Sequence, residues 1–217
     1  MVTKILLKTK EEWRKNRTRL GGSDAAAVLG QSPHMSNVEL WEIKTGMREQ
    51  EDISEKPYVK YGTEAEEHLR ALFALDFPQY EVLYEENNLY LNDRYPFAHA
   101  SLDGVLVERE TGRKGVLEIK TTNILRSMQK EKWDHRIPQN YFAQVLHYLM
   151  VTELEFAVLK AQLRYDFGGD IVLHTRHYLI ERSDYEADIQ YLAEQEKLFW
   201  DNYVIPKRRP DRLLPEI

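Results

Sequence analysis

The stretch "VLEIKTT" at residues 116–122 sets two opposite charges inside an apolar, β-branched run that is typical of a buried strand. Alternation along a strand places Glu118 and Lys120 on one face and Ile119 on the other. Buried charge is costly unless it is paired or bound to a metal ion. The stretch therefore predicts either a structural ion pair or a chemical site, and its neighbours must distinguish the two.

A further acidic residue lies on the other arm of an expected hairpin. Asp103 stands in "SLDGV" at the head of that arm, and a turn near Thr111-Gly112 folds the two arms together. In any register close to the turn, Asp103 lies opposite or diagonal to Glu118 and Lys120. Crowded carboxylates raise one another's pKa unless a divalent cation neutralises them, and magnesium or manganese prefers oxygen ligands. The pattern favours metal-dependent hydrolysis of a phosphodiester, with Lys120 orienting the attacking water or stabilising the transition state.

Length and composition predict one soluble domain. The 217 residues are 42% hydrophobic and 30% charged, enough for one sizeable core, and we expect a single domain over residues 1–217. No apolar run is long enough to span a membrane and no signal-peptide pattern begins the chain, so we expect a cytoplasmic protein with no membrane partner. The absence of cysteine excludes disulfides and Cys-ligated metals. The net charge of −6 argues only weakly against nucleic acid, because basic residues cluster near both ends of the chain.

Hydrophobic periodicity predicts a central mixed sheet flanked by helices, in an α/β (α+β) arrangement. We expect helices over about 9–17, 23–30, 36–46, 63–75, 138–152 and 183–203, the second capped by Ser23 or Asp24 and the fourth by Thr63. We expect strands over about 80–87, 88–93, 97–110, 114–122, 154–164 and 171–180.

Five stretches between about residues 11 and 152 follow one another in the order of a known family. They are "EEWRKNRTRLGGSDAAAVLG", "YGTEAEEHLRALF", "HASLDGVL", "VLEIKTT" and "YFAQVLHYLMVT". Together they resemble the phage lambda exonuclease or YqaJ-like viral recombinase family of the PD-(D/E)xK nuclease superfamily. The resemblance implies a restriction-endonuclease-like core and a Mg²⁺-dependent 5′→3′ exonuclease, with Mn²⁺ as a substitute. Such an enzyme degrades one strand of double-stranded DNA from an end and leaves a 3′ single-stranded tail for recombination.

The resemblance also implies partners and a setting. Members of the family close into trimeric rings of identical chains and often work with a single-strand annealing protein. We therefore expect a homo-oligomer that acts on double-stranded DNA ends. The resemblance further implies a phage or prophage gene expressed in a bacterial cytoplasm.

The family's metal-binding and catalytic positions can be carried over one residue at a time. They are filled here by Asp103, Glu118, the carbonyl of Ile119 and Glu66 as metal ligands, and by Lys120 as the catalytic lysine. Glu66 keeps the family's spacing within its helix, and Glu64 and Glu67 are nearby acids that a one-residue alignment error would confuse with it. Without the resemblance, each of these three glutamates is most simply a solvated helix residue.

Two further groups of residues match family positions. Gln144 and Tyr141 match a helix beside the active site, although a solvated amide and ordinary core packing are their simplest readings. Ser23 and Arg17 match a pocket for the 5′-phosphate of the degraded strand, where a hydroxyl and a guanidinium suit an anion. The segment before Ser23 is one residue shorter than the lambda enzyme's, so Arg19 is an alternative to Arg17.

Other functions stay open at this point. The same superfamily contains endonucleases and junction resolvases, and a non-cleaving DNA-binding protein could share the fold. Zinc binding is disfavoured because no HExxH or similar spacing connects the histidines, which include His99, His147, His174 and His177.

Overall fold

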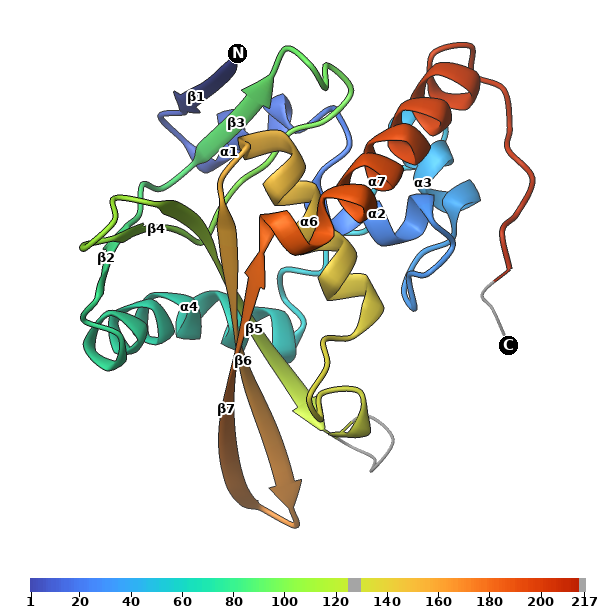
Figure 1. Ribbon diagram of the computed structural model, residues 1–217. Helices are drawn as coiled ribbons and strands as arrows, with labels where there is room; N and C mark the ends of the chain where they lie inside the picture. Colours follow the sequence, from blue (N-terminus) through green and yellow to red (C-terminus); the bar gives the residue numbers. More distant parts are fainter. Residues whose placement is uncertain (125–129, 215–217) are drawn as a thin grey trace.

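The computed structural model in Figure 1 describes residues 1–124 and 130–214 and contains two β-sheets with helices packed around them. The strands are β1 (Val2–Leu6), β2 (Tyr80–Leu83), β3 (Asn88–Asn92), β4 (Gly104–Glu108), β5 (Lys114–Ile124), β6 (Phe156–Phe167) and β7 (Asp170–Glu181). The helices are α1 (Lys10–Asn16), α2 (Gly22–Val28), α3 (Asn37–Lys44), α4 (Pro57–Asp76), α6 (Gln139–Thr152) and α7 (Glu186–Phe199). A 3₁₀ turn, Arg182–Tyr185, precedes α7, and a π-helical turn, Trp200–Val204, follows it.

The larger sheet has five strands in the order β2-β4-β5-β6-β7, and the smaller sheet pairs β1 with β3. Strand β5 pairs antiparallel with β4 and parallel with β6, so the sheet is mixed. In Figure 1, α4 covers one face of this sheet, whereas α6 covers the other with α2 and α7 outside it. This arrangement confirms the predicted fold class of a central mixed sheet flanked by helices.

Each helical layer has its own core. On one face of the sheet, Leu69 and Phe73, four residues apart on α4, pack with Leu117 and Ile119 of β5. On the other face, α6 is buried from Ala143 onward because it lies between the sheet and the outer helices. No helix in the described parts of the chain is both long and apolar enough to cross a membrane.

Two predicted helix caps are wrong. Helix α4 begins at Pro57, whose fixed φ suits the first helical turn, so Thr63 lies inside the helix and its hydroxyl donates to the Val59 carbonyl. Helix α2 is capped at Gly21, whose N–H donates to Asp24 Oδ2 at 2.9 Å. Ser23 therefore lies within the first turn of α2 and is exposed.

Two of the predicted strands, over residues 80–87 and 97–110, are longer than the observed ones. Strand β2 stops at Leu83, and the segment before Gly104 makes only isolated bridges, at Ala98 and Ala100. The sequence reading missed β1, which finds its partner only when β3 lies beside it. Both errors arise because pairing partners, rather than local propensity, decide short strands.

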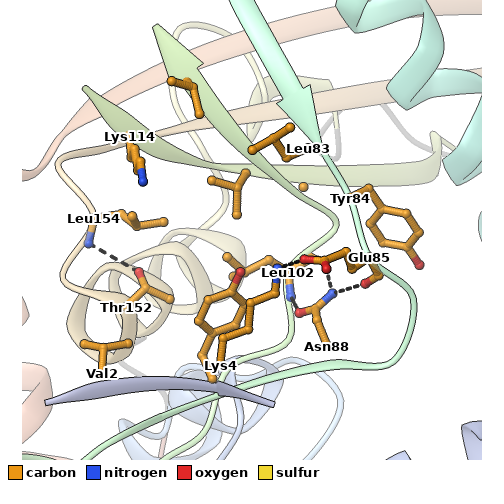
Figure 2. A pocket seen from close by; sticks show the side chains of 14 residues that line it. Val2, Lys4, Leu83, Tyr84, Glu85, Asn88, Leu102, Lys114, Thr152 and Leu154 are labelled. Carbon is orange, nitrogen blue, oxygen red and sulfur yellow. Dashed lines mark hydrogen bonds and ion pairs between the residues drawn. The ribbon is translucent and has the colours of Figure 1, made fainter. Parts of the chain in front are cut away.

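An apolar pocket of about 350 Å³ lies between the two sheets. Figure 2 shows its wall, where Leu83, Leu102 and Leu154 contribute apolar side chains. At one end the buried Asn88 side chain accepts from the Leu102 N–H at 2.8 Å and donates to the Leu102 carbonyl at 2.9 Å. Asn88 therefore fixes the backbone immediately before Asp103.

A buried ion pair joins α6 to α7. His147 Nδ1 lies 2.7 Å from Glu196 Oε1, its Nε2 lies 2.9 Å from the His99 carbonyl, and both side chains are fully buried. Burial alone would lower the pKa of His147, but Glu196, the His99 carbonyl and the more distant Asp24 raise it above the ordinary value of 6.5. Folding therefore stabilises the imidazolium form relative to its stability in the unfolded chain.

This pair predicts a pH dependence of stability. Because the pKa of His147 is raised on folding, its stabilising effect is fully present below about pH 6.5 and is lost as the pH rises through the folded-state pKa. We expect the free-energy difference between the wild-type protein and His147→Gln to shrink above that pH, by at most about 1.4 kcal/mol per pH unit. Urea unfolding of both proteins from pH 6 to 9 measures it. A constant difference across this range would show that His147 stays neutral.

Candidate active site

The β4–β5 hairpin brings Asp103 against the charged stretch of β5. Gly104 pairs with Leu117, which places Asp103 beside Glu118, and Asp103 Oδ2 accepts a hydrogen bond from the Ile119 N–H at 2.8 Å. The side chain of Ile119 points into the core under α4. Glu118 and Lys120 lie on the opposite face and line a cavity of about 700 Å³ with Asp103. Strand alternation and the hairpin register thus bring Asp103, Glu118 and Lys120 to one cavity, as the sequence predicted.

Glu118 and Lys120 form an ion pair, but the pair leaves one oxygen unused. Lys120 Nζ lies 2.6 Å from Glu118 Oε1, which also accepts from Gln144 Nε2 at 3.0 Å. Glu118 is 1% exposed, and its Oε2 has no hydrogen-bond partner within the described chain. A buried carboxylate oxygen without a donor is costly. A purely structural ion pair does not explain it, whereas a ligand approaching from the cavity would.

A third carboxylate reaches the same cavity from α4. Glu66 contacts Arg70 one helical turn later, and Arg70 Nε donates to the Asp103 carbonyl at 2.6 Å. Glu67 also lines the cavity, whereas Glu64 does not. Arg70 therefore ties Glu66 to the segment that carries Asp103. The sequence reading missed Arg70, although its i,i+4 spacing from Glu66 was visible.

The three carboxyl groups hold their protons unusually tightly. Burial and then Asp103 raise the pKa of Glu118 to about 8, and the same two causes raise the pKa of Glu66 to about 7. Burial also raises the pKa of Asp103, although Lys120 and the Ile119 N–H act in the opposite direction. Burial is the largest single influence and would lower the pKa of Lys120, but Glu118, Tyr148 and Asp103 together outweigh it and the net shift is upward. The centre therefore has an excess of negative charge that a cation would relieve.

The donors at this centre suit a hard divalent ion. Asp103, Glu118 and Glu66 offer carboxylate oxygens, and Glu118 Oε2 is buried without a partner among the described residues. The Ile119 carbonyl stays a ligand expected from the family resemblance, because Ile119 is not among the residues that line the cavity. Within the described residues, no three His, Cys, Asp or Glu side chains are gathered closely enough to hold an ion by themselves. The residues fit a site in which two or three carboxylates, a backbone carbonyl and water share the coordination.

Helix α6 supplies an amide and two aromatic rings to the same cavity region. Gln144 Nε2 donates to Glu118 and also to the Tyr148 hydroxyl, at 2.6 Å. The Tyr141 ring lies 5.4 Å from Lys120 Nζ and stacks on Trp133, 5.4 Å between centroids. Gln144 is thus a positioning group for Glu118 rather than a solvated amide. The sequence reading did not single out Tyr148, because its spacing was that of core residues.

A second cavity of about 470 Å³ adjoins the acidic centre and shares Trp13 and Arg17 with it. Ser23 also lines this second cavity. The Arg17 guanidinium lies 4.2 Å over the Trp13 ring, and its Nε donates to His99 Nε2 at 3.3 Å. Arg19 does not line this cavity, and its carbonyl accepts from Lys44 Nζ. The structure therefore brings Arg17 and Ser23 together and leaves Arg19 outside.

His99 accepts a hydrogen bond from Arg17 and so fixes its guanidinium. The sequence did not predict this contact. The ring is 2% exposed, and burial followed by the nearby Arg17 lowers its pKa to about 2. The neutral ring can therefore accept the Arg17 N–H. A side chain on Gly21 would meet His99 Nε2 at 3.1 Å, so the glycine keeps this contact open.

Comparison with known proteins gives one family match. The model of the YqaJ-like viral recombinase domain matches residues 11–155. The uncharacterized protein YqaJ of Bacillus subtilis (strain 168) is 31% identical over 204 residues, which cover 93% of this chain and 59% of that protein. The chain thus spans about three fifths of the length of this curated relative.

Solved structures show the same fold. The alkaline exonuclease LHK-Exo from Laribacter hongkongensis aligns with a TM-score of 0.64 at 18% identity and covers 92% of this chain and 97% of its own. A phage related exonuclease from Haemophilus somnus 129PT aligns with a TM-score of 0.53 at 12% identity, covering 90% and 99% of the two chains. At these identities the likeness establishes the fold alone.

Proposed function

Because this chain belongs to the family of YqaJ-like viral recombinase domains, we propose that it is a deoxyribonuclease that digests one strand of double-stranded DNA from a 5′ end. The observation that carries the proposal is the acidic centre. Three carboxyl groups with raised pKa surround Lys120 in an open cavity, and Glu118 Oε2 has no partner within the described chain. The name of LHK-Exo as an alkaline exonuclease and its complex with dAMP support the proposal by analogy.

The chemistry proposed for this centre is hydrolysis of a phosphodiester. Mg²⁺, or Mn²⁺ in its place, would be held by Asp103, Glu118, Glu66 and the Ile119 carbonyl and would supply Lewis-acid stabilisation of the phosphate. Lys120 Nζ, on the cavity face, would donate to the attacking water or to the phosphate oxygens as charge develops. Gln144 holds Glu118 in place by donating a hydrogen bond to Glu118 Oε1, the oxygen that also contacts Lys120.

The proposed direction of digestion depends on the cavity around Arg17 and Ser23. Only Nε of Arg17 has a hydrogen-bond acceptor among the described residues, so the outer nitrogens of the guanidinium are available to an anion. Trp13 and His99 fix the guanidinium in place, which lowers the entropic cost of binding. A 5′-phosphate bound here would enter the cavity next to the acidic centre, because Arg17 lines both cavities.

We expect the protein to digest 5′-phosphorylated duplex faster than 5′-hydroxyl duplex and Arg17→Ala to lose most of this preference. Removal of one charged hydrogen bond from a partly desolvated site costs about 1.5–3 kcal/mol, or roughly ten- to a hundredfold in rate. Initial rates on the two duplexes, measured under single-turnover conditions, give the ratio directly.

Arg19→Ala is the matched control. It removes the same charge from a residue two positions later in the chain that does not line the cavity. It should keep the wild-type ratio of rates. If Arg19→Ala loses the preference and Arg17→Ala keeps it, Arg19 reads the phosphate. If the wild-type protein does not distinguish the two ends, this assignment of the cavity is wrong.

An endonuclease or junction resolvase on the same fold is the second candidate, since the acidic centre alone would serve either reaction. Incubation of linear and closed circular duplex with and without Mg²⁺ separates the candidates. An exonuclease leaves the circles intact, an endonuclease opens them, and a non-cleaving DNA-binding protein changes neither. A homo-oligomeric ring and a single-strand annealing partner in a bacterial cytoplasm remain proposals that rest on the family alone.

A further inference from the structure

A basic surface segment of seven residues follows the last helical turn, and it is not part of the acidic centre. The segment "PKRRPDR", residues 206–212, is called the strap below, and it holds Lys207, Arg208, Arg209 and Arg212 against one acid, Asp211. All four cations are exposed. The strap is therefore a local concentration of positive charge on a chain whose net charge is −6.

The strap is held in a defined conformation. The side chain of Asn37, 3% exposed, donates to the Asp211 carbonyl at 2.8 Å and accepts from the Leu213 N–H at 3.0 Å. At the other end, the Arg208 N–H donates to the Tyr203 carbonyl at 3.0 Å. Pro206 and the buried Pro210 restrict the backbone further. Little backbone entropy remains to be lost when such a segment binds a partner.

Within the described chain the four strap cations make no ion pair, whereas several other arginines do. Arg48, Arg94, Arg113 and Arg176 each contact a carboxylate. Across residues 1–124 and 130–214, no carboxylate forms an ion pair with Lys207, Arg208, Arg209 or Arg212. Their charge is therefore available to an anionic partner.

Leu213, the residue after the strap, lies against one end of a loop that lines a cavity of the active-site region. Figure 1 shows the C-terminal segment, in red, running past α3, and Leu213 packs on Gly30, where an added Cβ would meet Leu213 Cβ at 2.8 Å. Gly30 and Asn37 flank the loop whose Ser32 and Met35 line a cavity of about 600 Å³. That cavity also contains Lys120 and Gln144 of the acidic centre. One long ligand could therefore contact both the strap and the centre.

We propose that the strap binds the phosphate backbone of duplex DNA outside the active site. This rests on the proposed function for the identity of the ligand, because a duplex whose end lies in the acidic centre is longer than the cavity and continues beyond it, where surface cations can contact its phosphates. Three of the four cations are arginines, whose planar guanidinium groups match phosphate oxygens in pairs. An acidic protein surface would suit the same charges less specifically.

The test compares two double variants with the same net charge, both in a Lys120→Ala background and without added divalent metal, so that digestion is negligible during the binding measurement. Arg208→Gln/Arg209→Gln removes two strap charges, and Arg94→Gln/Arg109→Gln removes two exposed charges on other parts of the surface. Binding of a labelled blunt duplex is measured over a salt series. In the strap variant the negative slope of log K against log salt should be shallower by about 1.8, because each lost phosphate contact removes about 0.9 from its magnitude. Between about 50 and 200 mM salt, the control should lose about twelvefold more affinity than the strap variant.

Each other outcome overturns the proposal. Equal losses in the two variants would show that only net charge matters. Suppose that the strap variant keeps the slope but is retained more weakly on a poly-glutamate column, and that the control variant is retained normally. The strap would then be assigned to an acidic protein surface. If Lys120→Ala protein fails to bind duplex at all while the wild type cleaves no DNA, the proposed function and the strap's ligand fall together. If the wild type cleaves DNA but the strap variant keeps the wild-type slope, only the proposal for the strap is refuted.

Discussion

Lys120→Ala should fold and bind duplex DNA but cleave it about 10²–10³-fold more slowly than the wild type. Lys120 Nζ lies on the cavity face, 2.6 Å from Glu118, and the side chain is 22% exposed, so a substrate can reach it. Loss of a group that acts only as charge develops lowers kcat without weakening ground-state binding. Quenched-flow cleavage of end-labelled duplex, together with urea unfolding, measures the two effects.

The structural alternative makes the opposite prediction for the same variant. If Lys120 only neutralises Glu118, its removal leaves a buried carboxylate without its counter-charge, and stability should fall while activity per folded molecule stays near normal. Lys114→Ala, on an exposed position of the same strand, is the matched control and should change neither quantity. Wild-type activity per folded molecule in Lys120→Ala would refute the catalytic assignment.

Asp103→Asn and Glu118→Gln should each abolish detectable cleavage, because each removes a carboxylate from the proposed metal site while keeping the shape of the side chain. Groups that hold one ion act as a unit, so the double variant should be no more defective than either single variant. Duplex binding should be unchanged or tighter, because negative charge near the phosphate is relieved. Cleavage rates and duplex affinities of all three variants provide the measurement.

Glu64→Gln is the control for these substitutions. Glu64 is exposed on α4 and lies outside the acidic cavity, so its neutralisation should leave cleavage unchanged. Independent, multiplying defects in Asp103→Asn and Glu118→Gln would show that the two carboxylates serve separate sites. Titration of the wild-type protein with Mg²⁺, followed by calorimetry, gives a readout of ion binding that does not depend on activity.

Much of the site could be read from the chain because local patterns carry it. The two-residue period of β5 determines that Glu118 and Lys120 share a face, and the hairpin turn determines that Asp103 lies beside them. The order of five stretches identified the family and, with it, the fold. These features depend on neighbours in sequence, so a sequence reading reaches them.

Tertiary structure alone decided which other side chains complete the centre. Arg70 reaches the Asp103 carbonyl from α4, and His99, in a loop, accepts a hydrogen bond from the Arg17 guanidinium. It also decided that Arg17 rather than Arg19 faces the second cavity.

The physical reason is that periodicity reports how buried a position is, whereas a hydrogen bond depends on where two distant backbone segments come to lie. Arg17 and His99 are 82 positions apart in the sequence, and no local signal in the chain marks their contact. Only the packing of the segment around His99 between Leu20 and α6 brings the ring under the guanidinium. Strand and helix patterns were therefore determined by the sequence alone, and the polar contacts between them were determined by the packed fold.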